Sequence, residues 1–273
     1  MTVPSIKLND GIQIPQLGFG VWQVGNDEAA EVVGKALETG YRHIDTAAIY
    51  GNEEGVGKAL KNSGLPRGDI YLTTKLWNTD QGYDSALKAL EASLKRLQTD
   101  YVDLYLIHWP VPAQDRFLDS WRALIKLREQ GLVKSIGVSN FRIADLERVI
   151  KETGVTPVLN QIELHPQFQQ NELRVFHEKK DIVTEAWSPL GQGKILENPV
   201  LKSIAAKHGK TVAQIILRWH LDIGNIVIPK SSTPARIKEN FDVFGFQLTS
   251  GEHDAISELN SPDGRIGPHP DSM

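Results

Sequence analysis

Cysteine is absent from the 273-residue sequence. Disulfide bonds, thiolate nucleophiles and zinc sites with cysteine ligands are therefore excluded. The sequence also lacks an apolar run long enough to span a bilayer, and Met1–Ser5 shows no basic segment leading into an apolar one. We therefore expect neither a membrane-spanning nor a secreted protein, but a soluble cytoplasmic one.

A strong excess of charge of either sign is also missing. Lysine and arginine number 30 and aspartate and glutamate 34, which gives a formal net charge of −4. This balance does not indicate a nucleic-acid-binding protein or a general polyanion binder, although it leaves room for a local cationic pocket. Hydrophobic residues make up 40% of the chain, enough for an ordinary globular core.

Short apolar runs alternate with amphipathic stretches, after a hairpin at Ser5–Leu8 and Ile12–Pro15 around an Asp-Gly turn. Strands are predicted at Leu17–Gly20, His43–Thr46, Ile70–Leu76, Val102–His108, Ser135–Ser139, Val158–Glu163, Ile182–Trp187 and Ile226–Pro229. Helices are predicted at Glu28–Glu38, Glu53–Leu60, Ser85–Leu97, Phe117–Glu129, Leu146–Glu152, Glu172–Lys179, Val200–Lys207, Val212–Leu221, Ile237–Phe241 and Glu252–Leu259. About eight strand–helix pairs without a linker predict a single domain over residues 1–273.

Two architectures fit this alternation, a closed (β/α)8 or TIM barrel and an open doubly wound sheet. Polar residues at or just beyond the predicted strand ends favour the barrel, because there the ends converge on one face where active sites are found. These residues are Asp45, Lys75, His108, Ser139, Asn140, Gln161 and Lys230. We therefore predict an α/β protein, a (β/α)8 TIM barrel with an N-terminal β-hairpin and an extra C-terminal helix.

Common nucleotide and metal motifs are missing. Gly18-Phe-Gly20 begins like a dinucleotide fingerprint, but Gln23 stands where the third glycine belongs, and there is no P-loop. No two histidines have the helical spacing of a metal site, so we expect no metal. We expect His177, His208 and His253 to be ordinary residues on helix surfaces.

Lys75 lies within an otherwise apolar predicted strand, so its ammonium needs a carboxylate nearby. Asp45, at the same level of the neighbouring strand, is the expected partner, and Tyr50 follows it on a loop. A structural ion pair is the simpler interpretation. If the ammonium lies beside the phenol, however, it stabilises the phenolate and lowers the pKa of Tyr50 towards the range where acid–base catalysis works.

His108 ends the next predicted strand, within Leu106-Ile-His-Trp-Pro110. Taken alone, it could equally be a hydrogen-bonded core histidine. At the level of Lys75 and Asp45 in a barrel, its imidazole N–H could orient a carbonyl oxygen.

Several longer motifs follow one another in register along essentially the whole chain. They are His43–Ala47 with Ile49–Glu53, Leu104–Pro110, Ser135–Phe141, Asn160–Gln161, and Ile228–Ser231 with Arg236, Glu239 and Asn240. Together they resemble the aldo-keto reductase superfamily. Within it, Gln161–Pro166, Pro189–Gly193 and His269–Asp271 are most similar to bacterial members that include the 2,5-diketo-D-gluconate reductases.

The resemblance implies an NADPH-dependent carbonyl reductase acting on small molecules, and we expect a monomer. Tyr50 would be the general acid, Lys75 and Asp45 its tuning pair, and His108 the orienting donor. Hydride would pass directly from the nicotinamide to the carbonyl carbon, without a metal or a covalent intermediate. The cofactor-binding residues would be Gly20, Val21, Ser139, Asn140, Gln161, Trp187, Ser188, Leu190, Gly191, Lys230, Ser231, Ser232, Arg236, Glu239 and Asn240.

Within that set, the resemblance assigns Ser139, Asn140 and Gln161 to the nicotinamide carboxamide. It assigns Trp187 to stacking on the nicotinamide ring, at a position where many family members carry tyrosine. The path of the pyrophosphate would follow residues 188–191.

The preference for the phosphorylated cofactor has a physical basis of its own. Lys230, Ser231 and Arg236 cluster beside a predicted strand end and the start of a helix, which suits a dianion. A site specific for NAD would instead carry an acidic residue for the ribose hydroxyl. The simpler interpretation is that both cations are solvated surface charges.

Three tryptophans, Trp22, Trp77 and Trp109, follow or flank predicted strand ends, so we expect them to line a substrate pocket. Trp121 and Trp219 lie within predicted helices and are expected in the core. The connections after the fourth and seventh barrel strands are shorter than the family's usual ones, which predicts an open site and broad specificity.

Two other functions stay open at this point. The chain could be an NADPH-binding, redox-sensing subunit with weak turnover, or an aldolase that forms a Schiff base on Lys75. The physiological substrate does not follow from the sequence.

Overall fold

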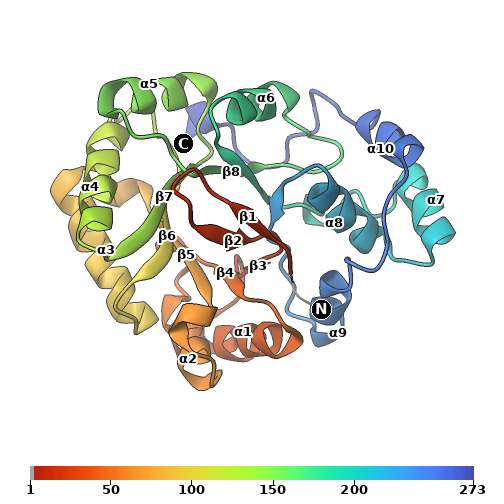
Figure 1. Ribbon diagram of the computed structural model, residues 1–273, viewed down its shortest axis with the longest axis horizontal. Helices are drawn as coiled ribbons and strands as arrows, with labels where there is room; N and C mark the ends of the chain where they lie inside the picture. Colours follow the sequence, from red (N-terminus) through yellow and green to blue (C-terminus); the bar gives the residue numbers. More distant parts are fainter. Residues whose placement is uncertain (1–2) are drawn as a thin grey trace.

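The computed structural model describes residues 3–273 and is built around an eight-stranded parallel sheet (Figure 1). Neighbours in the sheet follow one another in the chain, which is the order expected of a barrel. The strands are β3 (Phe19–Gly20), β4 (His43–Asp45), β5 (Tyr71–Leu76), β6 (Val102–Ile107), β7 (Val133–Ser139), β8 (Leu159–Glu163), β9 (Val183–Trp187) and β10 (Ile226–Val227).

The sheet closes on itself between β3 and β10. Leu17 forms a parallel bridge with Val227, and the amide of Gly18 donates to the carbonyl of Val227 at 2.9 Å. The amide of Gly20 donates to the carbonyl of Pro229 at 3.1 Å. The predicted barrel is therefore confirmed against the open sheet, whose outer strands would have unpaired edges.

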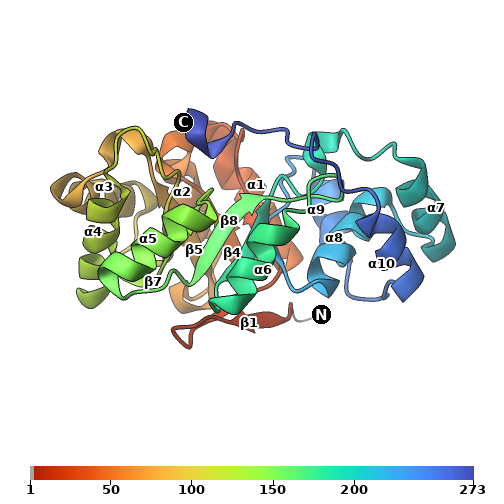
Figure 2. The same cartoon turned by 90° about the horizontal axis from the view of Figure 1, so that it is seen from above.

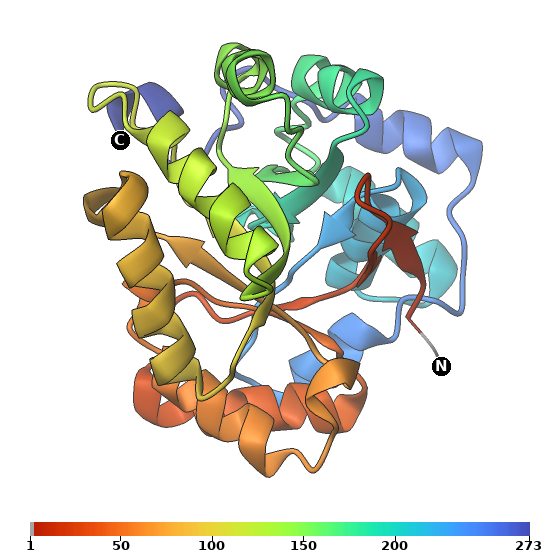
Figure 3. The same ribbon diagram turned by 60° about the vertical axis from the view of Figure 1, so that its left-hand side comes forward.

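The strands form where the sequence is apolar on both faces. In β6, all six residues are buried, as expected of a parallel strand covered by helices outside and side chains inside. The helices surround the sheet (Figures 1 and 3). They are α1 (Asn26–Thr39), α2 (Glu53–Asn62), α3 (Tyr83–Leu97), α4 (Phe117–Glu129), α5 (Ile143–Thr153), α6 (Asn171–Lys179), α7 (Pro199–His208), α8 (Val212–Asp222), α9 (Pro234–Phe241) and α10 (Ser250–Ser257).

Helix α1 shows how the outer layer is fixed. It buries one face at helical spacing, from Ala29 through Val33 to Leu37, and ends at Gly40, whose φ of 123° suits only glycine well. The first turn of α1 packs closely on Gly55 of α2. A Cβ atom at Gly55 would lie 2.3 Å from the carbonyl oxygen of Asn26, so any larger residue there would push the two helices apart. Short 3-10 turns complete the chain at Ala48–Tyr50 (η1), Arg67–Asp69, Asn78–Asp80, Gly191–Gly193 and Pro270–Ser272.

The predicted hairpin is present as β1 (Ser5–Lys7) and β2 (Gln13–Pro15), and it covers the amino ends of the barrel strands (Figure 2). Leu8 and Ile14 are buried against Tyr71, Leu104 and neighbouring apolar residues. The hairpin therefore closes one end of the barrel, and the carboxyl ends of the strands face the other side.

The predicted extra C-terminal helix is also present, as α10, and the chain after it runs across the carboxyl ends of the strands (Figure 2). Trp121 and Trp219 are buried core residues, as predicted. No helix among residues 3–273 is both long enough and apolar enough to cross a membrane.

The position predicted for His177 is wrong. Its side chain is buried rather than on the helix surface, with hydrogen-bonding contacts to Asn160 at 3.1 Å and Thr184 at 2.9 Å. Burial lowers the pKa of His177 to about 3, and Arg174 adds to the effect, so the ring is neutral and ties α6 to β8 and β9.

Candidate active site

The barrel brings the predicted polar residues to one face. Asp45 is the last residue of β4, and Lys75 lies one residue before the end of β5. His108 directly follows β6, and Ser139 ends β7. These side chains come from separate strand–helix units, so only the closed barrel places them around a common centre.

Lys75 is fully buried, and its ammonium has three oxygen neighbours. Its Nζ lies 2.5 Å from Oδ1 of Asp45, 2.9 Å from the carbonyl oxygen of Thr46 and 3.5 Å from the hydroxyl of Tyr50. These match the three N–H donors of an ammonium. Burial alone would lower the pKa of Lys75, but the negative charge of Asp45 offsets it and the pKa is raised, so the group stays charged.

Tyr50 reaches this ammonium from η1, in the loop after β4. The ring centroid lies 5.1 Å from Nζ of Lys75, and the side chain is only partly buried. Burial raises the pKa of Tyr50 above its ordinary value, and Lys75 opposes the rise without reversing it. The predicted contact with Lys75 is therefore present, but the predicted net lowering of the pKa is wrong in this structure.

His108 completes the group. Its ring packs edge-on against Tyr50, with centroids 5.7 Å apart, and against Trp77 at 5.2 Å. Burial, and then the charge of Lys75, hold the pKa of His108 well below 6.5. The imidazole is therefore neutral and offers one N–H as a hydrogen-bond donor rather than a positive charge.

Gln161 links this group to a carboxyl that was not singled out from the sequence. Its Nε2 donates to Oδ2 of Asp45 at 2.8 Å and to Oε2 of Glu185 at 3.0 Å. Glu185 is fully buried in β9. The sequence does contain a signal for this buried carboxyl, because Glu185 is a charged residue within a mainly apolar strand, as Lys75 is in β5.

Ser139, Asn140 and Trp187 form a connected set beside Gln161. The hydroxyl of Ser139 donates to the carbonyl of Gln161 at 2.8 Å. Nδ2 of Asn140 donates to the carbonyl of His108 at 3.0 Å, and its Oδ1 accepts from the indole Nε1 of Trp187 at 2.8 Å. The residues predicted to contact a nicotinamide thus lie together next to Asp45 and His108.

The predicted phosphate site lies farther along the same face. Lys230 and Arg236 are exposed and make no ion pair with any of residues 3–273. Ser231 accepts from the amide of Thr233 at 3.1 Å, at the start of α9, where backbone N–H groups and the helix dipole favour an anion. Glu239, farther along α9, accepts from the hydroxyl of Thr211 at 2.9 Å.

The remaining predicted cofactor residues lie at strand ends, in turns and in α9. Gly20 ends β3 and Val21 follows it, and both are buried. Ser188 and Gly191 have positive φ, 48° and 56°, in the turn after β9, with the partly buried Leu190 between them. Ser232 is exposed and precedes α9. Asn240 is buried and lies within α9.

The three predicted pocket tryptophans lie in different settings. Trp77 contacts His108, and Trp109 is buried with its ring parallel to that of His108 at 6.4 Å. Trp22 is 45% exposed, and no aromatic or hydrogen-bonding contact joins it to this group. A hollow of about 500 Å³ adjoins η1, lined by Asn26, Ala48, Ile49, Gly51, Glu53, Glu54, Trp77, Asp80 and Arg96.

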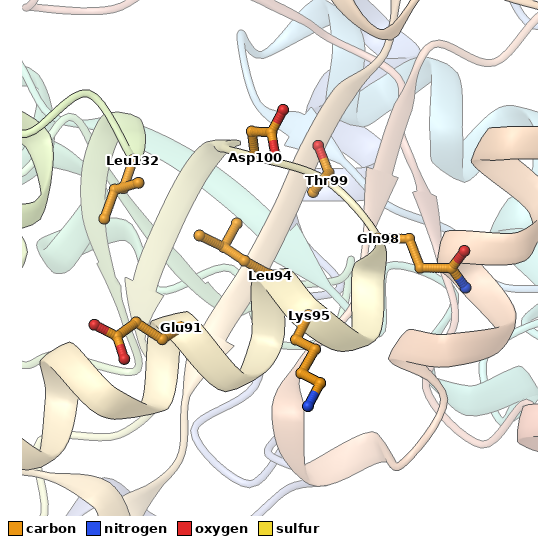
Figure 4. A pocket seen from close by; sticks show the side chains of 7 residues that line it. All are labelled: Glu91, Leu94, Lys95, Gln98, Thr99, Asp100 and Leu132. Carbon is orange, nitrogen blue, oxygen red and sulfur yellow. The ribbon is translucent and has the colours of Figure 1, made fainter.

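A larger hollow of about 620 Å³ lies away from these residues (Figure 4). Its lining comes from the end of α3 and the turns before β6 and β7, which belong to the amino ends of the strands. The lining residues are Glu91, Leu94, Lys95, Gln98, Thr99, Asp100 and Leu132. None of them belongs to the predicted site.

The C-terminal tail is anchored over Trp187 by Glu163, which the sequence did not point to. Oε1 of Glu163 accepts from the amide of Ile266 at 2.6 Å, and Oε2 from that of Gly267 at 2.9 Å. A Cβ atom at Gly267 would lie 2.4 Å from the indole of Trp187, so the tail rests directly on that ring. We call this contact of Glu163 with the two amides the tail anchor.

Comparison with known proteins gives one consistent result. The family model described as "Aldo/keto reductase family" matches residues 16–261. A methylglyoxal reductase, DkgA, of Escherichia coli strain K12 is 55% identical over 98% of this chain and 97% of its own.

Solved structures agree. An aldo/keto reductase from Brucella melitensis is 72% identical with a TM-score of 0.92, covering 94% of this chain and 100% of its own. A mutant of Gox0644 in complex with NADPH is 52% identical with a TM-score of 0.97, covering 100% of this chain and 99% of its own.

The tail anchor gives a prediction for Glu163→Gln. Burial alone would raise the pKa of Glu163, but hydrogen bonds from His165, Ile266 and Gly267 more than offset it and the pKa is lowered from 4.5. The anchor should therefore hold above pH 4.5 and weaken as the pH falls through the lowered value. Losing the charge should speed amide exchange at residues 266–267 about tenfold or more, by hydrogen–deuterium exchange.

Glu172→Gln, a change at an exposed site on α6, is the matched control and should leave exchange of the tail unchanged. Equal exchange of the two tail amides in wild type and Glu163→Gln would contradict the anchor.

Proposed function

Because the chain belongs to the aldo/keto reductase family, we propose that it reduces aldehydes and ketones by direct hydride transfer from NADPH, with Tyr50 as the general acid. Membership makes the chain an NADP-dependent oxidoreductase acting on carbonyl compounds. We also propose that residues 1–273 act as one domain and as a monomer.

The observation that carries the proposal is the contact of Lys75 Nζ with both Asp45 and Tyr50, at 2.5 Å and 3.5 Å. In carbonyl reduction, the phenol of Tyr50 gives its proton to the developing alkoxide. The ammonium of Lys75 stabilises the phenolate that remains, which makes the transfer easier. Asp45 keeps Lys75 charged within the barrel.

His108 has a different part in the proposal. As a neutral imidazole beside Tyr50, it donates an N–H to the carbonyl oxygen and orients it, and this hydrogen bond strengthens as negative charge develops there. The carbonyl carbon is thereby turned towards the hydride donor.

NADPH fits the residues of this face. When bound, it supplies the hydride. The amide nitrogen of Gln161 donates to two carboxyl groups, so its side-chain oxygen is the group left for the nicotinamide carboxamide. Ser139 and Asn140 are assigned to the same carboxamide. Trp187 offers a flat ring held by Asn140. The turn at residues 188–191 accommodates the pyrophosphate.

The adenosine end of the cofactor has matching partners. The cations Lys230 and Arg236, which have no ion-pair partner among residues 3–273, suit the ribose phosphate at the start of α9, together with Ser231 and Ser232. Glu239 and Asn240 are assigned to the adenosine, and Gly20 and Val21 to the cofactor's path across the barrel.

The substrate class is proposed from the pocket and the relatives. Trp77 and Trp109 flank His108, and such an aromatic wall suits apolar or modestly polar carbonyl compounds. Trp22 is assigned to the substrate from its sequence position alone, because it is 45% exposed and makes no aromatic or hydrogen-bonding contact with this group. Keto sugars and small diketones are included, and the relative named methylglyoxal reductase supports a dicarbonyl compound as the first substrate to test.

Tyr50→Phe should leave the Kd for NADPH nearly unchanged and reduce kcat about 100-fold or more, the usual effect of losing a general acid. The assay follows NADPH absorbance with a panel of aldehydes, diketones and keto sugars. Tyr83→Phe, at an exposed tyrosine of α3, is the control and should be unaffected. Near-normal turnover of Tyr50→Phe would remove Tyr50 from the role. A wild-type protein that binds NADPH but reduces nothing would favour the redox-sensing subunit.

Lys230→Ala and Arg236→Ala should weaken NADPH binding by about tenfold or more, because each removes a charge-assisted contact to a phosphate. NADH binding should change little. Isothermal titration with both cofactors measures the difference. Lys238→Ala, at an exposed lysine of α9, is the control and should change the affinity for neither cofactor. Equal losses for the two cofactors in the first two variants would refute the phosphate assignment.

A further inference from the structure

Glu185 lies inside the barrel, beneath the group around Lys75. It is fully buried and pairs in register with Gln161 of β8 and Ile226 of β10. Its Oε2 accepts from Nε2 of Gln161 at 3.0 Å. Its Oε1 has no hydrogen-bond partner among the described residues and lies 3.6 Å from Nε2 of His43.

Within the part of the chain that the structure describes, Glu185 faces a single cation. Among residues 3–273, the titratable groups that face it, from β4, β5 and η1, are His43, Asp45, Tyr50, Tyr71 and Lys75. Burial lowers the pKa of His43 to about 4, so that ring is neutral. Lys75, the only ammonium facing Glu185 in the described part of the chain, already pairs directly with Asp45.

Two ionised carboxylates and one ammonium would leave an uncompensated negative charge in the middle of the barrel. Such a charge is avoided in proteins when a proton can neutralise it. Asp45 touches Lys75, so Glu185 is the carboxyl that takes the proton. Burial first, and then the charge of Asp45, raise the pKa of Glu185 to about 8.

We propose that Glu185 is a positioning residue, a neutral carboxylic acid near pH 7 that acts through Gln161 and Asp45 to set how readily Tyr50 gives up its proton. Gln161 provides the connection, since one amide nitrogen donates to both carboxyl groups, at 2.8 Å and 3.0 Å. The inference rests on the proposed role of Tyr50 as the general acid.

The direction of the effect follows from the charges. Above about pH 8, Glu185 ionises and adds a negative charge near Tyr50, which favours the phenol over the phenolate. Carbonyl reduction requires the phenol, whereas alcohol oxidation, the reverse reaction, requires the phenolate. The ionised Glu185 therefore shifts the midpoints of both pH profiles, for reduction and for oxidation, to higher pH.

Glu185→Gln tests the inference because glutamine is close in shape and cannot ionise. We expect both pH profiles of kcat, for reduction with NADPH and for oxidation with NADP⁺, to shift to lower pH by about one unit. On the rising limb of the oxidation profile, the kcat of Glu185→Gln, expressed as a fraction of its own plateau value, should therefore be about tenfold higher than that of the wild type at the same pH. A purely structural role would instead scale both rates equally at every pH.

The matched control is Asp103→Asn. Asp103 is also a buried carboxylate, but it pairs with Arg67 and Lys134 near the amino end of β6. The Asp103→Asn variant should be less stable than the wild type, but neither of its pH profiles should shift. Superimposable profiles of wild type and Glu185→Gln, or a shift to higher pH, would overturn the proposal.

A measurement on the wild-type protein covers the case in which Glu185→Gln does not fold. With glutamate labelled by ¹³C at the carboxyl carbon, NMR should show one signal of a neutral acid at pH 7 that titrates near pH 8. The absence of such a signal would overturn the proposal. This result does not depend on Tyr50, so a failure of the Tyr50 assignment, seen as an active Tyr50→Phe, is distinguishable from a failure here.

Discussion

The site depends on one requirement, that a buried ammonium must have a counter-charge. Lys75 is fully enclosed by the barrel, and without Asp45 its charge would cost several kcal/mol. The pair at 2.5 Å fixes the carboxyl ends of β4 and β5 relative to each other. Tyr50 on one side and Gln161 on the other both contact a member of that pair. The proposed proton donor Tyr50, the proposed cofactor ligand Gln161 and the second buried acid Glu185 are thereby connected to one charge.

Much of this arrangement could be predicted from the sequence, because its signals are local. Continuous apolar runs such as Leu104–Ile107 indicate strands buried on both faces, and the helices between them show helical periodicity. A polar residue at the end of such a run has no place in the core, so Asp45, Lys75 and His108 pointed to a site. The eight-stranded fold and the family are confirmed. The roles of the individual residues stay predictions.

What the sequence could not provide depends on residues that meet only after folding. Gln161 and Asp45 are 116 positions apart, and Glu163 binds amides more than 100 positions away. The burial of His177 follows from how α6 packs on β8 and β9. The pKa of Tyr50 is a balance between burial and the charge of Lys75, and the spacing of the residues indicates only the second of these.

The most direct test of the central pair is a double-mutant cycle with Asp45→Asn, Lys75→Met and both together, followed by the free energy of unfolding. Each single change leaves a buried group without its partner and should destabilise the protein by about 3 kcal/mol or more. The double change removes both charges and should recover much of that loss while carbonyl reduction stays impaired. Additive losses in the double variant would contradict the account, because the two side chains would then not act as a pair.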